Sequence, residues 1–140
     1  MEKIIVYTDG GSRGNPGHAG IGVVINDKKY SEYIGIKTNN QAEYMALIFA
    51  LKKIKQVFSK NVINYIVDIY MDSELIVKQM NNEYKVNENL ALLYLEVHNL
   101  IIELKTKVNF RHVLREDNKL ADSLVNQALD EKLKKTSNLF

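Results

Sequence analysis

The apolar residues change their spacing near Asn40, and this change constrains the fold more than any other feature. Before it, three strand-like segments at residues 3–9, 19–26 and 29–37 are separated by a glycine-rich turn and a tight turn. After it, apolar side chains recur at the i, i+3, i+4, i+7 spacing of an amphipathic helix: Tyr44, Leu47, Ile48, Leu51, Ile54 and Phe58. The chain should therefore begin as an antiparallel meander followed by a helix.

The rest of the chain alternates shorter elements. We expect a strand at residues 65–70, helices at 73–80 and 90–104, a strand at 107–113 and a final helix from about Asn118. A helix that follows one strand and leads to another indicates a crossover connection and hence a mixed sheet. The predicted fold is α/β, with the order βββαβααβα and a mixed five-stranded sheet. We expect residues 1–133 to form a single domain and the polar residues 134–140 to fray.

The composition excludes several classes of protein. There are no cysteines, so disulfides and thiolate sites for zinc or iron–sulfur clusters are ruled out, and oxygen ligands are the easiest metal site to build. Hydrophobic residues make up 46% and charged residues 26%, as in an ordinary globular chain. The net charge of +2 is too small to indicate nucleic-acid binding by itself. With no signal-peptide pattern and no apolar run of membrane length, we expect a cytoplasmic protein, with a monomer as the default.

Four acidic residues stand where predicted strands end or predicted helices begin: Asp9, Glu43, Asp72 and Asp122. Each has an ordinary explanation when it is considered alone. Asp9 precedes two glycines and could open a turn, and Asp72 could cap a helix. Glu43 could be the N3 member of a capping box that starts at Asn40, and the helix dipole favours an acid such as Asp122 in a first turn.

The four acids are more informative as a set. If the strands that end at Asp9 and Asp72 are neighbours, all four carboxylates converge at one end of the sheet, where their mutual repulsion requires cations. Carboxylate oxygens suit Mg²⁺ or Mn²⁺, and two such ions could activate water and stabilise the leaving oxygen of a phosphodiester. The order and spacing alone therefore indicate a metal-dependent hydrolase of phosphodiesters.

Four segments, in this order, resemble the motifs of ribonuclease H type 1: residues 7–17 (YTDGGSRGNPG), 38–43 (TNNQAE), 71–73 (MDS) and 112–122. With the element order, the resemblance covers nearly the whole chain. It implies a ribonuclease H-like fold and hydrolysis of the RNA strand of an RNA–DNA hybrid, leaving 5′-phosphate and 3′-hydroxyl ends. It also implies that Asp9, Glu43, Asp72 and Asp122 bind Mg²⁺, or Mn²⁺ as a substitute, with two ions when substrate is bound.

The resemblance leaves the assisting cation open. His112 lies ten residues before Asp122, as does the family's mobile catalytic histidine, and an imidazole titrates near neutrality. However, His112 falls within a predicted strand, and its surroundings are similar to a branch in which an arginine at the position of Arg115 takes this place. His112 could then be a structural strand residue. His18 and His98 have no such placement and are interpreted as surface or packing residues.

The resemblance also places substrate-binding residues along a groove, where amide and backbone groups contact 2′-hydroxyls or the sugar–phosphate backbone: Gly10, Gly11, Arg13, Asn15, Asn39, Asn40 and Ser73. Reading 2′-hydroxyls distinguishes an RNA strand from DNA. A glycine-rich segment at residues 10–17 lets the main chain approach a nucleic acid closely, although it could also be a plain flexible loop.

The chain departs from the better-known members in two ways. Many of them carry a basic helical protrusion, but residues 73–107 here contain four lysines, five glutamates and no tryptophan. We therefore expect this chain to belong to the branch that lacks the protrusion, with weaker, more salt-sensitive binding or a need for a partner domain. Glu74 stands where a glutamine is frequent, and its charge could disfavour nearby phosphate or tune metal affinity.

Two other functions are compatible with these motifs. One is a binding module with this fold that has lost catalysis, although four intact acids argue against it. The other is a different enzyme of the same fold, such as a nuclease of double-stranded RNA, a resolvase or a transposase core. Cleavage assays on RNA–DNA, RNA–RNA and DNA–DNA duplexes would separate these possibilities.

Overall fold

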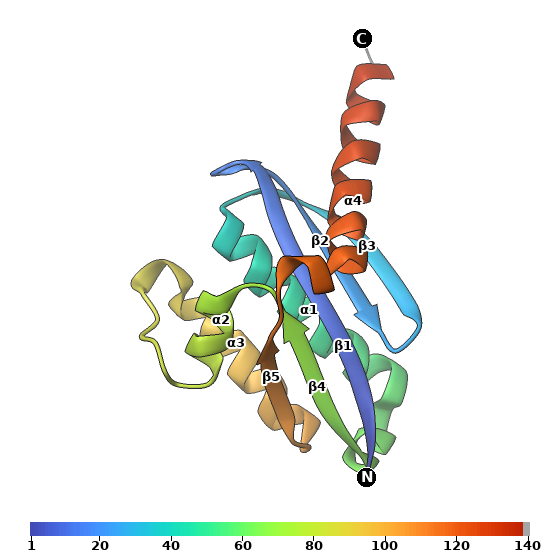
Figure 1. Ribbon diagram of the computed structural model, residues 1–140, viewed down its shortest axis with the longest axis vertical. Coiled ribbons are helices and arrows are strands. Elements are labelled where there is room, and N and C mark those ends of the chain that lie inside the picture. Colours follow the sequence, from blue (N-terminus) through green and yellow to red (C-terminus); the bar gives the residue numbers. More distant parts are fainter. Residues whose placement is uncertain (139–140) are drawn as a thin grey trace.

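The computed structural model describes residues 1–138, which form a mixed five-stranded sheet with helices on both faces (Figure 1). The strand order is β3-β2-β1-β4-β5; β1 pairs antiparallel with β2 and parallel with β4, and β4 pairs parallel with β5. The strands are β1 (Glu2–Gly14), β2 (Gly17–Ile25), β3 (Lys28–Lys37), β4 (Tyr65–Met71) and β5 (Val108–His112). The predicted fold class is confirmed.

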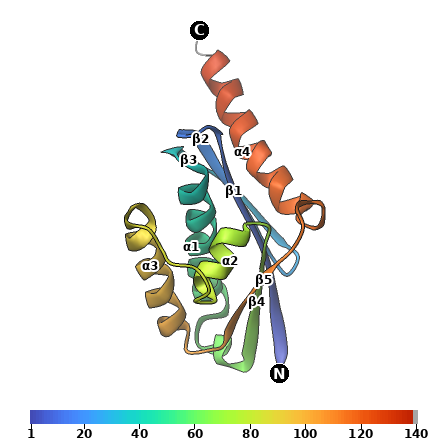
Figure 2. The ribbon, with the colours of Figure 1, turned by 60° about the vertical axis from the view of Figure 1, so that its left-hand side comes forward.

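The helices follow the predicted order, with two short 3-10 helices added, η1 and η2. Their bounds are α1 (Asn39–Phe58), η1 (Ser59–Asn64), α2 (Glu74–Met80), α3 (Glu88–Leu104), η2 (Arg115–Asp117) and α4 (Lys119–Asn138). In Figure 2, α1, α2 and α3 lie on one side of the sheet and α4 on the other. No helix within residues 1–138 is long and apolar enough to cross a membrane.

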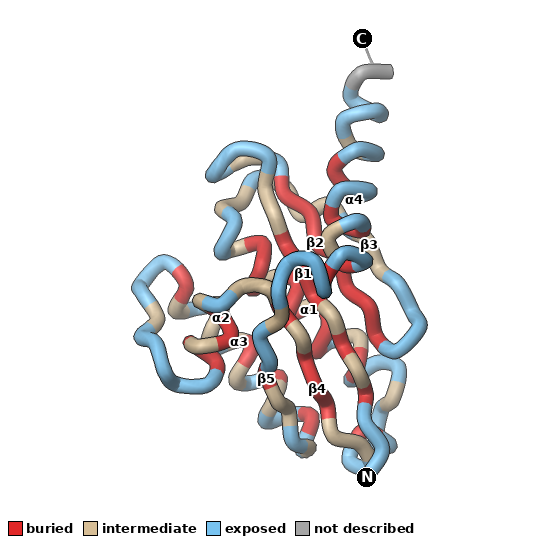
Figure 3. Tube along the Cα trace, viewed as in Figure 1, coloured by how far each residue is buried: buried red, intermediate tan, exposed pale blue. Residues whose placement is uncertain are grey.

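Helices cover both faces of the inner part of the sheet. Residues 19–25 of β2 are all buried (Figure 3), which explains why this strand is a continuous apolar run and not an alternating one. Two glycines allow the helices to approach the strands closely. A Cβ on Gly10 would clash with the carbonyl of Ala42 in α1, and a Cβ on Gly22 would clash with the carbonyl of Ala121 in α4. Both helices therefore lie directly against the strands at the end where the acids gather.

Two predicted boundaries were wrong. β1 does not end at Asp9 but continues to Gly14, pairing with β2 as far as Gly14 and Gly17. The glycine-rich segment is therefore mostly a long hairpin, because backbone pairing does not require side chains with strand propensity. The final helix continues past Lys134 to Asn138, and the fraying expected for residues 134–140 stays a prediction. Residues 139–140 of the predicted tail lie outside the described residues.

Candidate functional site

The parallel pairing of β1 and β4 brings two of the predicted acids together. The last paired residues are Thr8 and Met71, so Asp9 and Asp72 follow the pair at the same end of the sheet. Asp9 lies within the longer β1, whereas Asp72 comes directly after the last residue of β4. The predicted convergence therefore arises from the register of two parallel neighbours, and only Asp72 stands at a true strand end.

Glu43 reaches the same place from α1. The N–H of Gly10 donates to Glu43 Oε1 at 3.3 Å, across the close contact between β1 and α1. The capping box of this helix is formed by Thr38 and Gln41, so a capping role for Glu43 is wrong. Gln41 Oε1 accepts from the Thr38 N–H and Thr38 Oγ1 accepts from the Gln41 N–H, at 2.9 and 3.1 Å. Glu43 is thus free to face the sheet.

The other ordinary explanations can be tested in the same way. Ser73, and not Asp72, caps α2, because its hydroxyl accepts from the Ile76 N–H at 3.3 Å. Asp9 opens no turn, since β1 continues through it. Asp122 does lie in the first turn of α4, so the helix dipole still accounts for an acid at this position.

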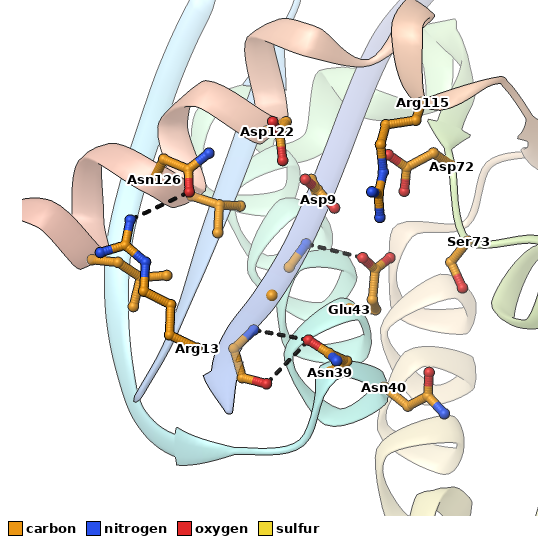
Figure 4. A pocket seen from close by; sticks show the side chains of 15 residues that line it. Asp9, Arg13, Asn39, Asn40, Glu43, Asp72, Ser73, Arg115, Asp122 and Asn126 are labelled. Atoms are coloured by element: carbon orange, nitrogen blue, oxygen red, sulfur yellow. Dashed lines mark hydrogen bonds between the residues drawn. The ribbon is translucent and has the colours of Figure 1, made fainter. Parts of the chain in front are cut away.

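The acids form a tight, mostly buried cluster. One carboxylate oxygen from each of Asp9, Glu43 and Asp72 lies within 4.8 Å of the others. Asp9 is only 7% exposed and Glu43 only 8%. Asp122 lines the same cavity and points toward Asp9 in Figure 4. The cavity has a volume of about 420 Å³ and is lined by Asp9, Gly10, Gly11, Ser12, Arg13, Asn39, Asn40, Glu43, Asp72, Ser73, Arg115, Asp122, Val125, Asn126 and Leu129.

Burial and mutual repulsion make these acids hard to ionise. Burial, followed by the charges of Asp72 and Asp122, raises the pKa of Asp9 from 3.8 to about 7 despite an opposing hydrogen bond with Glu43. Burial and the neighbouring Asp9 raise the pKa of Glu43 well above its ordinary value. Burial also raises the pKa of Asp72, opposed by the Asn118 amide and the Arg115 guanidinium.

The donor set fits a divalent cation. All the clustered ligands are carboxylates, as Mg²⁺ and Mn²⁺ prefer. Glu43 Oε2 is buried and has no hydrogen-bond partner within residues 1–138, so it keeps lone pairs for another ligand. A cation would offset the repulsion that raises the pKa values of these acids.

The two candidate cations have different positions. Arg115, in η2, lines the cavity. The charge of Arg115 lowers the pKa of Asp72 more than the charge of His112 does. His112 is the exposed last residue of β5 and is not among the residues that line this cavity. It is close enough to influence Asp72 and Glu74 electrostatically. Arg115 is therefore the cation that faces the carboxylate cluster.

The predicted substrate-binding residues also line the cavity, with one exception. Asn15 lies in a neighbouring cavity instead, where its Oδ1 accepts from the Asn39 N–H at 2.9 Å. The Ser12 N–H and hydroxyl both donate to Asn39 Oδ1, at 2.9 and 3.0 Å, so Asn39 is held from two sides. Arg13 donates to Asp130 at 2.7 Å and to Asn126 at 3.4 Å, which directs it toward α4 (Figure 4).

Sequence reasoning missed three polar residues at this site: Ser12, Asn118 and Asn126. Asn118 and Asn126 each lie four residues from Asp122, one helical turn away, and that spacing could have indicated them. Ser12 lies between two predicted binding residues. His18 and His98 lie elsewhere, against Tyr33 and Tyr94 respectively, which agrees with their interpretation as packing or surface residues.

The chain resembles known proteins over most of its length. A family model described as "Reverse transcriptase-like" matches residues 7–128. A protein of Halobacterium salinarum named ribonuclease HI is 33% identical over 92% of this chain and 65% of its own length. A protein of Mycobacterium tuberculosis named a bifunctional protein is 36% identical over 91% of this chain, but the match spans only 36% of that protein.

Solved structures agree with the sequence comparisons. A ribonuclease H1 isolated from compost, solved in complex with an RNA/DNA hybrid, is 47% identical and superposes with a TM-score of 0.89, covering 94% of this chain and 99% of that one. The ribonuclease H1 structure from Halobacterium salinarum is 34% identical, with a TM-score of 0.82 over 92% of this chain and 98% of the other. This chain belongs to the ribonuclease H family.

Proposed function

We propose that this chain is a metal-dependent endoribonuclease that hydrolyses the RNA strand of RNA–DNA hybrids and leaves 5′-phosphate and 3′-hydroxyl ends. The observation that carries the proposal is the cluster of Asp9, Glu43 and Asp72, whose oxygens lie within 4.8 Å of one another at the bottom of an open groove. Family membership and a relative solved with an RNA/DNA hybrid support the substrate class.

Asp9, Glu43, Asp72 and Asp122 would hold the metal, which we propose to be Mg²⁺, with Mn²⁺ as a substitute and two ions when substrate is bound. When bound, such ions activate the attacking water and stabilise the leaving oxygen of the phosphodiester. The carboxylates themselves supply the negative charge that selects a cation, and the covering helices keep this charge largely out of water. The Gly10 N–H holds Glu43 in its orientation toward the cluster.

We assign the assisting cationic role to Arg115. Its guanidinium lines the cavity beside Asp72, where it can attract the negative charge that develops on the reacting phosphate. His112 lies outside the cavity wall and would act on product as it leaves.

The groove beside the cluster suits the sugar–phosphate backbone of an RNA strand. Gly10 and Gly11 let the main chain approach closely, and Asn39, Asn40 and Ser73 present amide and hydroxyl groups to 2′-hydroxyls. Arg13, at the α4 side of the groove, is paired with Asp130 and would exchange this partner for a phosphate. Contacts of this kind select RNA without reading base sequence.

The test is cleavage of three labelled duplexes, RNA–DNA, RNA–RNA and DNA–DNA, with Mg²⁺ and with Mn²⁺. We expect cleavage of the RNA strand of the hybrid only, products with 3′-hydroxyl ends that a polymerase can extend, and no cleavage by Asp9→Asn. Cleavage of RNA–RNA at a comparable rate would favour a nuclease of double-stranded RNA. Binding of hybrid without cleavage in either metal would favour a catalytically silent module.

A further inference from the structure

Asn118 lies at the junction of the elements that carry the proposed metal ligands. It sits between η2 and α4 and is only 1% exposed. Its side-chain amide donates to the main-chain carbonyl of Thr8 at 2.9 Å, which ties the start of α4 to the β1 residue that precedes Asp9. The bond spans 110 residues of sequence, so it is a tertiary contact and not a local cap.

The main chain of Asn118 contacts two further members of the site. Its carbonyl accepts from the Asp122 N–H at 3.1 Å. This backbone bond lies in the first turn of α4 and helps to fix the main chain that carries the Asp122 side chain. The N–H of Asn118 donates to the Arg115 carbonyl at 3.0 Å, which closes the η2 turn. One residue therefore connects the backbone at Thr8, next to Asp9, with the backbone at Asp122 and Arg115.

The side chain of Asn118 also lies near Asp72, the acid that follows β4. Because the N–H₂ group faces an acceptor at Thr8, the opposite orientation of the amide is disfavoured. Asn118 Oδ1 and Thr8 Oγ1 are both buried without a hydrogen-bond partner among the described residues.

We propose that Asn118 is a positioning residue that fixes the relative placement of Asp9, Asp72 and Asp122 and thereby sets the metal affinity of the site. This inference rests on the proposed function. The alternative is a purely structural tether between β1 and α4. The two roles differ in what they change: a tether affects the stability of the metal-free protein, whereas a positioning residue also changes how strongly metal binds.

The experiment uses Asn118→Ser in the full chain, because serine is well accepted where helices begin but is too short to reach Thr8 and Asp72 together. Asn118→Ala is the second variant. The matched control is Asn81→Ala, because Asn81 also donates its side-chain amide to a strand carbonyl, that of Phe110 at 3.2 Å, and lies outside the cavity wall. Each protein is unfolded thermally without metal and across a Mn²⁺ titration, and its cleavage of hybrid is measured across Mg²⁺ concentrations.

We expect the Asn118 variants to require about 10-fold more Mg²⁺ for half-maximal activity, in line with the usual cost of losing a group that orients metal ligands. Their stabilisation by Mn²⁺ should shift to higher concentration by a similar factor. Asn81→Ala should lower the metal-free melting temperature while its metal dependence matches wild type. Asn118 variants with wild-type metal dependence would overturn the proposal.

The two hypotheses fail in different ways. If the wild-type protein cleaves hybrid and Asn118→Ser has the same metal dependence as wild type, the positioning role is wrong and the proposed function is not affected. A wild-type protein that is stabilised by Mn²⁺ but cleaves no hybrid refutes the proposed function, while the Mn²⁺ titration still decides the role of Asn118. A wild-type protein that neither cleaves nor responds to Mn²⁺ overturns both.

Discussion

Asp9 is buried among other acids, and its pKa of about 7 links its protonation to the stability of the metal-free protein. In the unfolded chain this pKa is near 3.8, so between about pH 4 and pH 7 the folded state holds a proton that the unfolded state has lost. The stabilisation linked to this proton is complete below about pH 4, declines as the pH rises from about 4 to about 7, and is lost above about 7. Without metal, the protein should therefore be less stable at pH 8 than at pH 5.5.

Asp9→Asn should reduce this dependence, because the amide resembles the protonated acid in shape and carries no charge. Glu43 and Asp72, whose pKa values are also raised, retain their part of it. In EDTA we expect the stability advantage of the variant over wild type to be larger at pH 8 than at pH 5.5 by about 1–3 kcal/mol. Urea unfolding at both pH values measures the difference. Asp27→Asn, in an exposed turn, serves as the control and should match wild type. Equal wild-type stability at the two pH values would contradict the prediction.

Arg115 and His112 can be separated by their effect on turnover. Because Arg115 lines the cavity, Arg115→Ala should lower kcat by about 100-fold, the usual effect of removing one group that stabilises developing charge. His112→Ala should lower it less than about 10-fold, since His112 lies outside the cavity wall. Arg111→Ala is the control, because Arg111 faces Asp68 at 3.9 Å on β4 and not the cluster. A larger loss in His112→Ala than in Arg115→Ala would reverse the assignment.

At the scale of elements, the position of Asp122 depends on how closely α4 approaches β2. Gly22→Ala would place a methyl group against the Ala121 carbonyl and Leu124, so α4 must move away. We expect a loss of about 1–3 kcal/mol in the free energy of unfolding, typical of an overpacked core, and reduced activity because Asp122 moves with the helix. Gly11→Ala is the control for stability, since its new methyl group would make only an ordinary contact with Val125. Equal stability of the two variants would show that α4 adapts freely.

The sequence predicts these elements well where their side chains carry the pattern. The change of apolar spacing near Asn40 correctly placed α1. The pairing of the strands that carry Asp9 and lead to Asp72, on which the convergence of the acids depended, is present in the structure. The extension of β1 to Gly14 was missed because glycine has no side chain whose alternation could reveal a strand. The capping box of Thr38 and Gln41 was visible as a Thr-x-x-Gln spacing, yet a box at Asn40 was considered instead.

The site was less predictable where tertiary contacts decide it. The four acids were predicted from apparent strand ends and helix starts together with the family resemblance, and all four line one cavity. Asn118 resembles any polar residue before a helix, and its burial depends on α4 crossing β1, which no local pattern encodes. The choice between His112 and Arg115 likewise depends on which loop faces the cavity, and that is decided by the η2 turn after β5.

At the scale of the whole molecule, the chain offers few positive charges to a nucleic acid. Its net charge is +2, and the segment between α2 and α3, where a basic protrusion would lie, is only residues 81–87. That segment contains Glu83 and Lys85, which cancel. The cations that line the groove are Arg13 and Arg115, and Arg13 is already paired with Asp130. Binding of hybrid should therefore be weak and rest on a few phosphate contacts.

We expect KM for hybrid to rise on the order of 10-fold between 50 and 200 mM salt, the change expected for two or three phosphate contacts, while kcat changes little. Glu83→Lys, which adds a cation where the protrusion is missing, should lower KM and make it more dependent on salt. The matched control is Glu2→Lys, which adds the same charge at the exposed opposite end of β1 and should leave KM close to wild type. Equal effects of the two substitutions would mean that the net charge governs binding, and not a local contact of the hybrid with the segment between α2 and α3. A wild-type KM that does not change with salt would show that the affinity for hybrid does not depend on contacts with charged phosphates.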